Sequence, residues 1–360
     1  MPVKVSFQIY LNIMSRVLVV ATSRKTRGGI TSVIKAHETG EQWKKFHCHW
    51  VQTHRDGPAW RKVLYFITGM ADFLIRLPFY DIVHIHTADY GTEKRKRIFA
   101  KLTKLFGKKL IVHLHSSGPE FSIGGMYRDL YKYSFTHADK VILLSNTWKQ
   151  EAIKAFHLPD DKMVVLYNPC PVVKPSSIEE REAYILFAGT LTHRKGYDDL
   201  IKAFARMASK YPKWRLKLAG NGEIEQGKAL TRELGIENQV DFLGWVNGEE
   251  KDNAFRHASV YCLPSYSEGF PMGVLDAWAY HLPVVTTPVG GIPDVGLDGK
   301  NVLLFSPGDI NGLAHKLDEL ICNHDCCFRL QAASETFATI NFNIKTISHQ
   351  LGLIYKSILK

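Results

Sequence analysis

Short apolar runs alternate with longer mixed stretches along the chain. In the first half the runs are Val17–Val20, Asp81–His86, Leu110–His115, Val141–Leu144 and Met163–Leu166. Largely apolar runs of this length are typical of strands that a parallel sheet buries on both faces. A helix is expected from Ile30, after the loop that follows the first run. The alternation of strands and helices predicts an α/β fold with parallel sheets.

A second series of strand-like runs begins at Tyr184–Phe187. The later runs are Arg215–Leu218, Val240–Leu243, Val260–Leu263 and Val284–Thr287, with a long helix expected over residues 196–209. Residues 168–175 contain three prolines, which do not fit inside a central strand or helix. We therefore predict an N-terminal domain over residues 1–172, joined by a C-terminal helix over residues 343–360, and a second domain over residues 173–342.

Two successive α/β units of similar size indicate two Rossmann-like domains that face each other. Ligands of such open sheets bind outside the carboxyl ends of the strands. The cleft between the two domains is therefore the expected active site.

The composition, with 45% apolar and 22% charged residues, is that of a globular protein. No run reaches the roughly 18–20 apolar residues that span a bilayer, and the start lacks the cleavage site of a signal peptide. Met14 directly precedes the first predicted strand, so residues 1–13 are expected to be dispensable. The cysteines are scattered and form no disulfide framework, which favours a reduced, cytoplasmic setting.

The net charge of +11 belongs entirely to the first half of the chain. Residues 1–180 hold 27 Lys and Arg against 15 Asp and Glu, whereas residues 181–360 hold 19 against 20. The densest run starts at Lys94, Arg95, Lys96 and Arg97 and continues to residue 109 without an acidic residue. A solvated helix face explains this run about as well as an anionic membrane surface does. Nucleic acid is disfavoured, because aromatic residues are not interleaved with the cations.

One segment of the second half combines carboxylates with glycines where a strand is followed by a helix. It runs from Ser265 through Glu268, Pro271 and Asp276 to Gly291. Asp276 falls in the second turn of the helix, about 7.5 Å along the axis from Pro271. Carboxylates so far apart suit two parts of one elongated ligand, with a phosphate between them on the free N–H groups of the helix start. The alternative is that Glu268 only caps the helix and Asp276 is solvated.

This segment resembles the donor signature of glycosyltransferase family 4, also called glycosyl transferases group 1. That signature has a glutamate, seven residues and a second glutamate, then a helix, a strand that begins with proline, and a Gly-Gly loop. The match extends over Phe187–Ala203, Leu218–Gly222, Phe242–Val246 and Asp298–Asp309, and in the first half it includes Gly28, Gly29 and His115. The resemblance implies the GT-B fold: α/β, with two Rossmann-like domains facing across a cleft and a C-terminal helix returning to the first domain.

The resemblance also implies roles for single residues. Lys195, with Arg194 beside it, is expected to hold the donor diphosphate, and Glu268 to bind hydroxyls of the donor sugar. Gly28 and Gly29 would let their loop approach the diphosphate, because glycine has no Cβ. The backbone of Gly269, Phe270, Met272 and Gly273 is expected to contact the sugar and the phosphates, and Asp276 the ribose. The base is expected at Gly244, Trp245 and Val246. His115 is expected to hydrogen-bond the donor sugar or an acceptor hydroxyl. The catalytic candidates are Glu268, His115 and Lys195.

Three residues depart from the family pattern or vary within it. Asp276 stands where the pattern has glutamate, which shortens the side chain by one methylene group. Thr190 stands where many members have an arginine, and Arg194 is expected to replace that charge. Asp294 follows the Gly-Gly loop where the acidic residue is usually glutamate.

Two groups of residues look like metal ligands, and we favour neither. His84 and His86 form an i, i+2 pair, as do His113 and His115, so each pair faces one side of its strand. No acidic or cysteine partner lies near them in the sequence. Residues 322–327 contain three cysteines and a histidine, but adjacent cysteines suit a tetrahedral ion poorly. Because the sequence has no Asp-x-Asp motif, we expect metal-independent transfer and no cofactor.

The sequence thus predicts a retaining, metal-independent glycosyltransferase that moves a sugar from a UDP- or GDP-linked donor to an acceptor hydroxyl, in polysaccharide or glycolipid biosynthesis. The expected acceptor is a sugar or a lipid-linked sugar. An anionic membrane surface at the inner face is a further expected partner, contacted through residues 94–97; nucleic acid is not. The alternatives are a nucleotide-sugar epimerase on the same scaffold, which needs no acceptor, and a non-catalytic nucleotide-sugar-binding protein.

Overall fold

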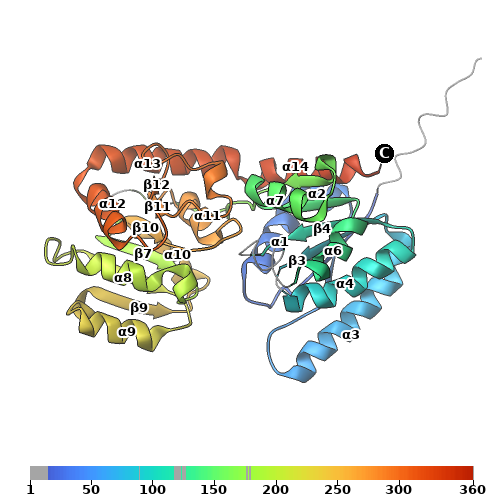
Figure 1. Cartoon of the computed structure of the whole chain (residues 1–360), viewed down its shortest axis with the longest axis horizontal. Helices are drawn as coiled ribbons and strands as arrows, with labels where there is room; N and C mark the ends of the chain where they lie inside the picture. The colour runs from blue at the N-terminus through green and yellow to red at the C-terminus, as the bar shows by residue number, and fades with distance from the viewer. Residues whose placement is uncertain are drawn as a thin grey trace, which may run out of the picture.

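A computed structural model describes residues 15–88, 90–116, 123, 127–175, 177 and 180–359. These residues form two six-stranded sheets whose strands are all parallel, with helices packed around each sheet (Figure 1). The strand orders are β2-β1-β3-β4-β5-β6 and β12-β11-β10-β7-β8-β9. The predicted α/β architecture of two Rossmann-like units is confirmed. Residues 1–14, on which the expectation about Met14 falls, lie outside the described residues.

The strands form at the predicted apolar runs, with two additions. The first sheet contains β1 (Val17–Ala21), β2 (His49–Gln52), β3 (Ile82–Thr87), β4 (Lys109–Leu114), β5 (Lys140–Leu143) and β6 (Met163–Val165). The second contains β7 (Tyr184–Ala188), β8 (Arg215–Ala219), β9 (Val240–Gly244), β10 (Val260–Leu263), β11 (Val284–Thr286) and β12 (Leu303–Leu304). The sequence pattern missed β2 and β12, because β2 buries only Trp50 and Val51 and β12 has only two residues.

Thirteen α-helices are described. In the first half these are α1 (Gly29–Thr39), α2 (Glu41–Lys45), α3 (Ala59–Arg76), α4 (Tyr90–Leu105), α6 (Arg128–His137) and α7 (Asn146–Phe156). The others are α8 (Tyr197–Ala205), α9 (Ile224–Glu233), α10 (Glu249–Arg256), α11 (Met272–Ala279), α12 (Ile310–Cys322), α13 (His324–Thr336) and α14 (Ile344–Ser357). Helix α8 is shorter than the predicted 196–209, because Gly196 lies in the left-handed region before it and turns follow it.

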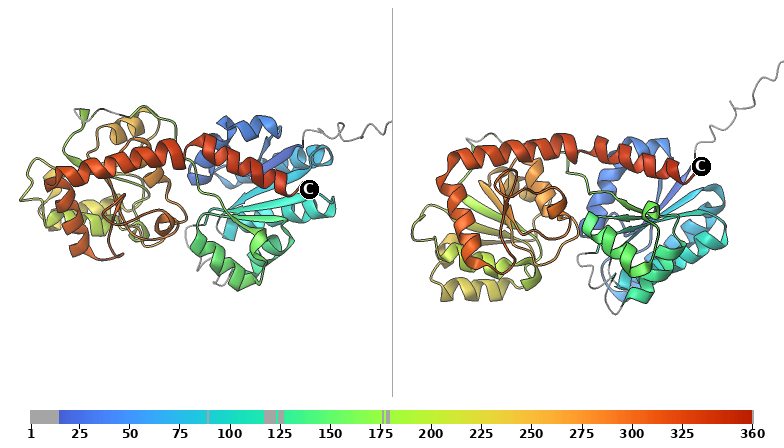
Figure 2. Two further views of the ribbon diagram at one scale, coloured as in Figure 1. Left: turned by 90° about the horizontal axis from the view of Figure 1, so that it is seen from above. Right: turned by 45° about the horizontal axis from the view of Figure 1, so that its top comes forward.

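The last two helices cross from the second sheet to the first, as Figure 2 shows. A single π-helical turn at Phe337–Asn341 joins α13 to α14. Helix α14 packs against α1 and α2 of the first domain, where Tyr355 meets Phe46 edge to face with 5.1 Å between the ring centroids. The backbone N–H of Gln42 donates to Ser348 Oγ at 3.2 Å. The expected return of the C-terminal helix to the first domain is confirmed.

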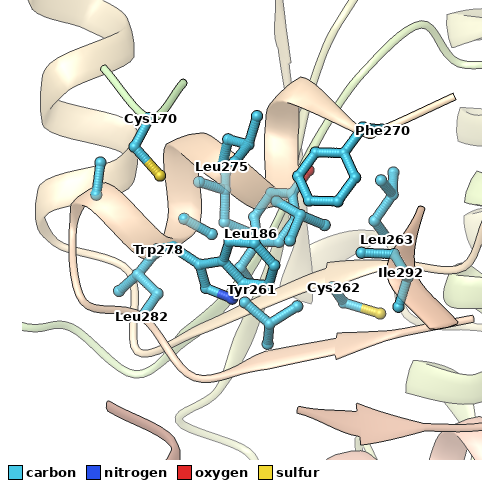
Figure 3. Packing of buried hydrophobic residues seen from close by; sticks show 14 of the residues in the cluster. Cys170, Leu186, Tyr261, Cys262, Leu263, Phe270, Leu275, Trp278, Leu282 and Ile292 are labelled. Carbon is cyan, nitrogen blue, oxygen red and sulfur yellow. The ribbon is translucent and has the colours of Figure 1, made fainter. Parts of the chain in front are cut away.

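Polar contacts and a buried aromatic cluster connect the two halves. Asp294 Oδ2 accepts hydrogen bonds from the backbone N–H of Asn146 at 2.7 Å and from the hydroxyl of Tyr167 at 3.0 Å. Around Trp278 of α11, apolar side chains of the second half pack together with Cys170 from the linker (Figure 3). Asp294 therefore links the two halves of the chain. This contact accounts for an acidic residue after the Gly-Gly loop, and no ligand is needed to explain it.

The prediction that residues 94–97 together form a membrane-binding patch is wrong. These four residues lie in helix α4, where successive side chains point about 100° apart. Lys96 is only 2% exposed and donates to Thr53 Oγ1 at 2.6 Å. Glu93 is also buried, and burial raises its pKa to about 7. Of the four cations only Lys94 is exposed, so they do not form one lipid-facing surface.

Candidate active site

The strand orders place the predicted ligand loops around one cleft. In the first sheet the order reverses between β1 and β3, and in the second it reverses between β7 and β10. Such a switch point leaves a crevice outside the carboxyl ends of the two strands, because their connections leave in opposite directions. The loops after all four strands line one cleft with a volume of about 1150 Å³.

Gly28 and Gly29 form part of the first-domain wall of the cleft. Gly28 has a φ of 127°, in the region that favours glycine, and it precedes α1 directly. A Cβ added to Gly29 would lie 3.5 Å from Cγ of Met272. The loop after β1 therefore comes into contact range of the start of α11 in the second domain.

A largely buried ion pair joins the two second-domain loops. Lys195 Nζ pairs with Glu268 Oε1, and Ser265 Oγ donates to the same oxygen at 2.7 Å. The side chains of Lys195 and Glu268 are 17% and 7% exposed, so bulk salt screens this pair much less than a surface pair. The pair holds a cation and a carboxylate side by side at the β7/β10 switch point.

Close backbone packing fixes the loops that carry this pair. A Cβ on Gly196 would lie 2.1 Å from the carbonyl oxygen of Pro264, and one on Gly273 would lie 2.0 Å from the hydroxyl of Tyr261. That hydroxyl donates to the carbonyl of Ala188 at 3.2 Å. Only glycine leaves room for these approaches, so Lys195 and the start of α11 are held in one relative position.

The start of α11 presents backbone N–H groups to the cleft. Met272 and Gly273 are its first residues and line the cleft, and N–H groups in a first turn have no partner within their own helix. The helix dipole adds a partial positive charge at this end. Together with Lys195, the helix start is suited to hold a phosphate.

Asp276 lies in the second turn of α11, as predicted, and is only 8% exposed. Its Oδ2 lies 2.7 Å from Nζ of Lys251 on α10. Burial raises the pKa of Asp276, and the Lys251 ammonium opposes this shift. The sequence analysis missed Lys251, because no spacing in the sequence indicates that α10 packs beside α11.

Trp245 offers a flat apolar surface at the edge of the cleft. Its side chain is 42% exposed, and the guanidinium of Arg27 from the first domain lies 5.4 Å from its ring centroid. An exposed indole beside a cation can stack against a planar ligand.

Four histidines form a row from the cleft into the first-domain core. His86 Nδ1 lies 2.9 Å from Nε2 of His115, which lines the cleft. Burial lowers the pKa of His115 to about 3, so this imidazole is neutral near pH 7. Farther in, His84 Nδ1 lies 2.8 Å from the hydroxyl of Tyr355. As predicted, the histidines of each strand share one face.

His84, His86 and His113 come together as a potential metal-ligand set. One ring nitrogen from each lies within 4.8 Å of the others. However, the rings of His84 and His113 stack face to face, with an interplanar angle of 5°. Ligand rings converge on an ion edge-on, so the stacking suits packing better than coordination. The interpretation of these histidines as structural stays a prediction.

Most of the predicted site residues gather in the cleft, and Arg194 and Gly244 are the exceptions. Those that line it are Gly28, Gly29, His115, Lys195, Trp245, Val246, Glu268, Gly269, Phe270, Met272, Gly273 and Asp276. Arg194 is not among the lining residues, and its Nη1 donates to the carbonyl of Ser267 at 2.7 Å. It is therefore committed to holding its loop. Thr190, which stands where many family members have an arginine, does line the cleft. Arg194 does not replace the positive charge of that arginine.

Two protein families match the chain, one in each half. The family Glyco_transf_4, Glycosyltransferase Family 4, matches residues 17–172, and the family Glycos_transf_1, Glycosyl transferases group 1, matches residues 172–336. The chain belongs to glycosyltransferase family 4. The resemblance drawn from the donor signature is confirmed, and this family 4 protein carries the family pattern in both domains.

Individual relatives agree with this assignment. An uncharacterized glycosyltransferase of Haemophilus influenzae is 31% identical over 59% of this chain and 61% of its own length. Lipopolysaccharide 1,6-galactosyltransferase of Salmonella typhimurium is 29% identical over 61% of each chain. The solved structure of HepE from Anabaena in complex with UDP-glucose has a TM-score of 0.78 and 19% identity, covering 95% of this chain and 99% of its own. The matches to the two sequence relatives thus span about three fifths of their length.

The ion pair between Lys195 and Glu268 provides the first test. We predict that Glu268→Gln and Lys195→Ala each lower glycosyl transfer at least about tenfold, or ~1.4 kcal/mol of transition-state stabilisation. Glu268→Gln keeps the shape and the contact with Ser265, so it should also stay folded. Lys195→Ala leaves a carboxylate buried and unpaired and should lower the melting temperature. The measurements are initial rates and thermal unfolding.

The matched control is Lys210→Ala in the same domain. Lys210 forms an ion pair with Asp318, but its side chain is 57% exposed, and a pair of this kind contributes little. Rates for Lys210→Ala should equal those of the unmodified protein. Normal rates in Glu268→Gln would contradict the assignment of the pair to the donor.

Proposed function

We propose that this protein transfers a glycosyl group from a nucleotide diphosphate sugar to an acceptor hydroxyl, with retention at the anomeric carbon. The observation that carries the proposal is the Lys195–Glu268 pair at the switch point, beside the free N–H groups of α11. Lys195 and the start of α11 are suited to bind a diphosphate, and the buried carboxylate of Glu268 is suited to bind sugar hydroxyls. Membership of family 4 supports the same reaction class.

The donor lies along the cleft from His115 to Trp245. The diphosphate binds between Lys195, the loop at Gly29 and the start of α11. The sugar lies at Glu268, whose contacts with Lys195 and Ser265 both use Oε1, so that Oε2 can accept from the ligand. The base stacks at the exposed face of Trp245. HepE, solved with UDP-glucose on the same fold, supports a UDP-linked donor.

The ribose lies at the far end of α11 from the sugar. Asp276 accepts from its hydroxyls, and the Lys251 ammonium opposes the rise in the pKa of this carboxyl that burial causes. Asp276 is one methylene group shorter than the glutamate of the family pattern. The ammonium of Lys251 can compensate by attracting the nucleotide toward α10. The short acidic side chain is therefore compatible with donor binding.

The cleft can assist the reaction without a covalent enzyme intermediate. The bond between the anomeric carbon and the diphosphate oxygen breaks, and a bond from the acceptor oxygen to the same face of that carbon forms. The acceptor proton moves to the departing phosphate oxygen. Lys195 and the α11 N–H groups stabilise the charge that grows on the diphosphate. His115, neutral through burial, hydrogen-bonds the sugar or the acceptor.

The acceptor is a sugar of a polysaccharide or a glycolipid. The lipopolysaccharide galactosyltransferase of Salmonella typhimurium supports this class. An epimerase on the same scaffold would convert the donor without an acceptor, and a binding protein would release no sugar. A transfer assay with labelled donor, run with and without acceptor glycans, separates the three functions.

We predict that transfer does not need a divalent metal ion, because Lys195 and the helix start already oppose the charge of the leaving diphosphate. The measurement is the transfer rate after dialysis against EDTA, with and without added Mg²⁺ or Mn²⁺. The rate should be the same in all samples. Activity that disappears in EDTA and returns with either ion would refute metal independence.

We also propose that the protein binds an anionic membrane surface, through helix α3 and not through residues 94–97. Trp60, Val63, Leu64 and Ile67 of α3 are between 48% and 63% exposed, at the spacing of one helix face. Helix α4 lies against α3 through Phe66 and Phe99 and adds further exposed apolar residues, Ile98 and Leu105. An apolar surface of this kind marks an interaction site.

The charges around this surface favour lipid over a second protein. Arg61 and Lys62 lie on α3 itself, in the half of the chain that carries the whole net positive charge. Cations attract anionic headgroups while the apolar face enters the interface, and Trp60 suits the headgroup level. No helix among the described residues is long and apolar enough to cross a membrane.

We predict that Trp60→Glu combined with Ile67→Glu lowers binding to phosphatidylglycerol-containing vesicles at least about tenfold, because both apolar side chains are lost and charge is added. Co-sedimentation measures the binding. Phe328→Glu on α13, also at an exposed phenylalanine, is the control and should bind normally. Equal binding to neutral vesicles would refute the proposal, and so would α3 variants that only dissociate a dimer.

A further inference from the structure

Two lysine–carboxylate pairs line the cleft on the side of the second domain. Lys195 and Glu268 come from loops that precede α8 and α11, and Lys251 of α10 pairs with Asp276 in the second turn of α11. All four residues belong to the cleft lining. Both members of the first pair are proposed to contact the donor. The second pair has the same composition, which raises the question of what its lysine contacts.

Lys251 lies where a ligand can reach it. It belongs to the first turn of α10, directly after the loop that carries Trp245, and residues 245–248 of that loop line the cleft with it. Its side chain is 39% exposed, whereas the side chain of Asp276 is only 11% exposed. The lysine therefore covers part of a buried carboxylate and is itself open to the cleft.

The ion pair changes what Asp276 can offer to a ligand. A free carboxylate is an acceptor at both oxygens and can accept from two neighbouring hydroxyls. Here Oδ2 lies 2.7 Å from Nζ of Lys251, and Oδ1 has no hydrogen-bond partner among the described residues. An ammonium has three N–H donors, so Lys251 has donors beyond the one that Oδ2 uses. The pair thus presents a carboxylate acceptor and ammonium donors side by side.

This pattern fits the ribose of a nucleotide. Ribose has two neighbouring hydroxyls, and each hydroxyl can both donate and accept. One hydroxyl can donate to Oδ1 of Asp276 while the other accepts from Lys251. Hydrogen bonds with a charged partner are about twice as strong as neutral ones. Because the lysine serves the second hydroxyl, the shorter acid needs to reach only one.

We infer that Lys251 binds one ribose hydroxyl of the donor directly, beside Asp276, and that the two residues together select ribonucleotides over deoxyribonucleotides. The inference rests on the proposed function, because it takes the ribose to lie at Asp276. A site built to hydrogen-bond a hydroxyl rejects an analogue without it, since polar groups of the site are left unpaired. With two partners, loss of either hydroxyl leaves a different charged group without its contact.

The experiment compares UDP with 2′-deoxy-UDP and 3′-deoxy-UDP in calorimetric titrations. We expect each analogue to bind the unmodified protein at least about tenfold more weakly than UDP. A protein that binds UDP and both analogues equally would overturn the inference and leave the proposed donor site intact. A protein that binds no UDP would refute the proposed donor site itself.

Two variants assign the hydroxyls to their partners. Asp276→Ala removes the carboxylate and keeps Lys251, so one analogue should bind as tightly as UDP and the other should stay at least about tenfold weaker. When Lys251→Met is added, UDP and both analogues should bind equally. The double variant leaves neither charge of the pair behind, so it avoids the destabilising effect of an unpaired buried charge.

The same titrations exclude a lysine that only balances the charge of Asp276. In that case Asp276 alone would recognise the ribose, and Asp276→Ala would bind UDP and both analogues equally, which would overturn the inference. A double variant that still discriminates as Asp276→Ala does would also overturn it, because the remaining selectivity would not come from Lys251.

The matched control is Lys228→Met on α9. Lys228 is 44% exposed and pairs with Glu225 at 2.9 Å, but it does not line the cleft. This variant should bind UDP and both analogues as the unmodified protein does, because an exposed pair of this kind contributes little. A loss of selectivity in Lys228→Met similar to that of the double variant would overturn the role of Lys251, since a general effect of charge would explain both.

Discussion

The ion pair between Lys195 and Glu268 is the contact on which the proposed donor site depends. It places a cation and a carboxylate at the β7/β10 switch point and shields both from bulk solvent. Removing water strengthens the interaction of each group with a ligand, but it also makes an unpaired charge costly. Each residue thus stabilises the other, and in the proposed donor complex a diphosphate and a sugar would contact them instead. The tight backbone contacts of Gly196 and Gly273 keep the pair beside α11.

Much of the fold and of the cleft could be predicted from the sequence. Buried parallel strands produce apolar runs that stand out, and the donor signature placed Glu268 and Asp276 on either side of one helix start. Local patterns of this kind are set by neighbours in the chain. Contacts between distant elements leave no such pattern, which is why Lys251, the partner of Asp276, was missed.

The roles of the charged residues were the part that the sequence predicted least reliably. A run of cations such as residues 94–97 looks uniform in the sequence, but a helix distributes it over all sides and buries Lys96. Arg194 stands next to Lys195 and was expected to share its role, yet its side chain turns to the carbonyl of Ser267. Asp294, at a family position, connects the two domains instead. Tertiary packing decides which charges reach the cleft.

The most direct test of the donor site is a crystal structure of the protein grown with UDP-glucose. We predict that the diphosphate lies about 3 Å from Lys195 Nζ and from the backbone nitrogens at the start of α11, a hydrogen-bonding distance. The sugar should contact Glu268 and the ribose Asp276. A nucleotide bound outside this cleft, or with its phosphates turned away from Lys195 and α11, would contradict the proposed site.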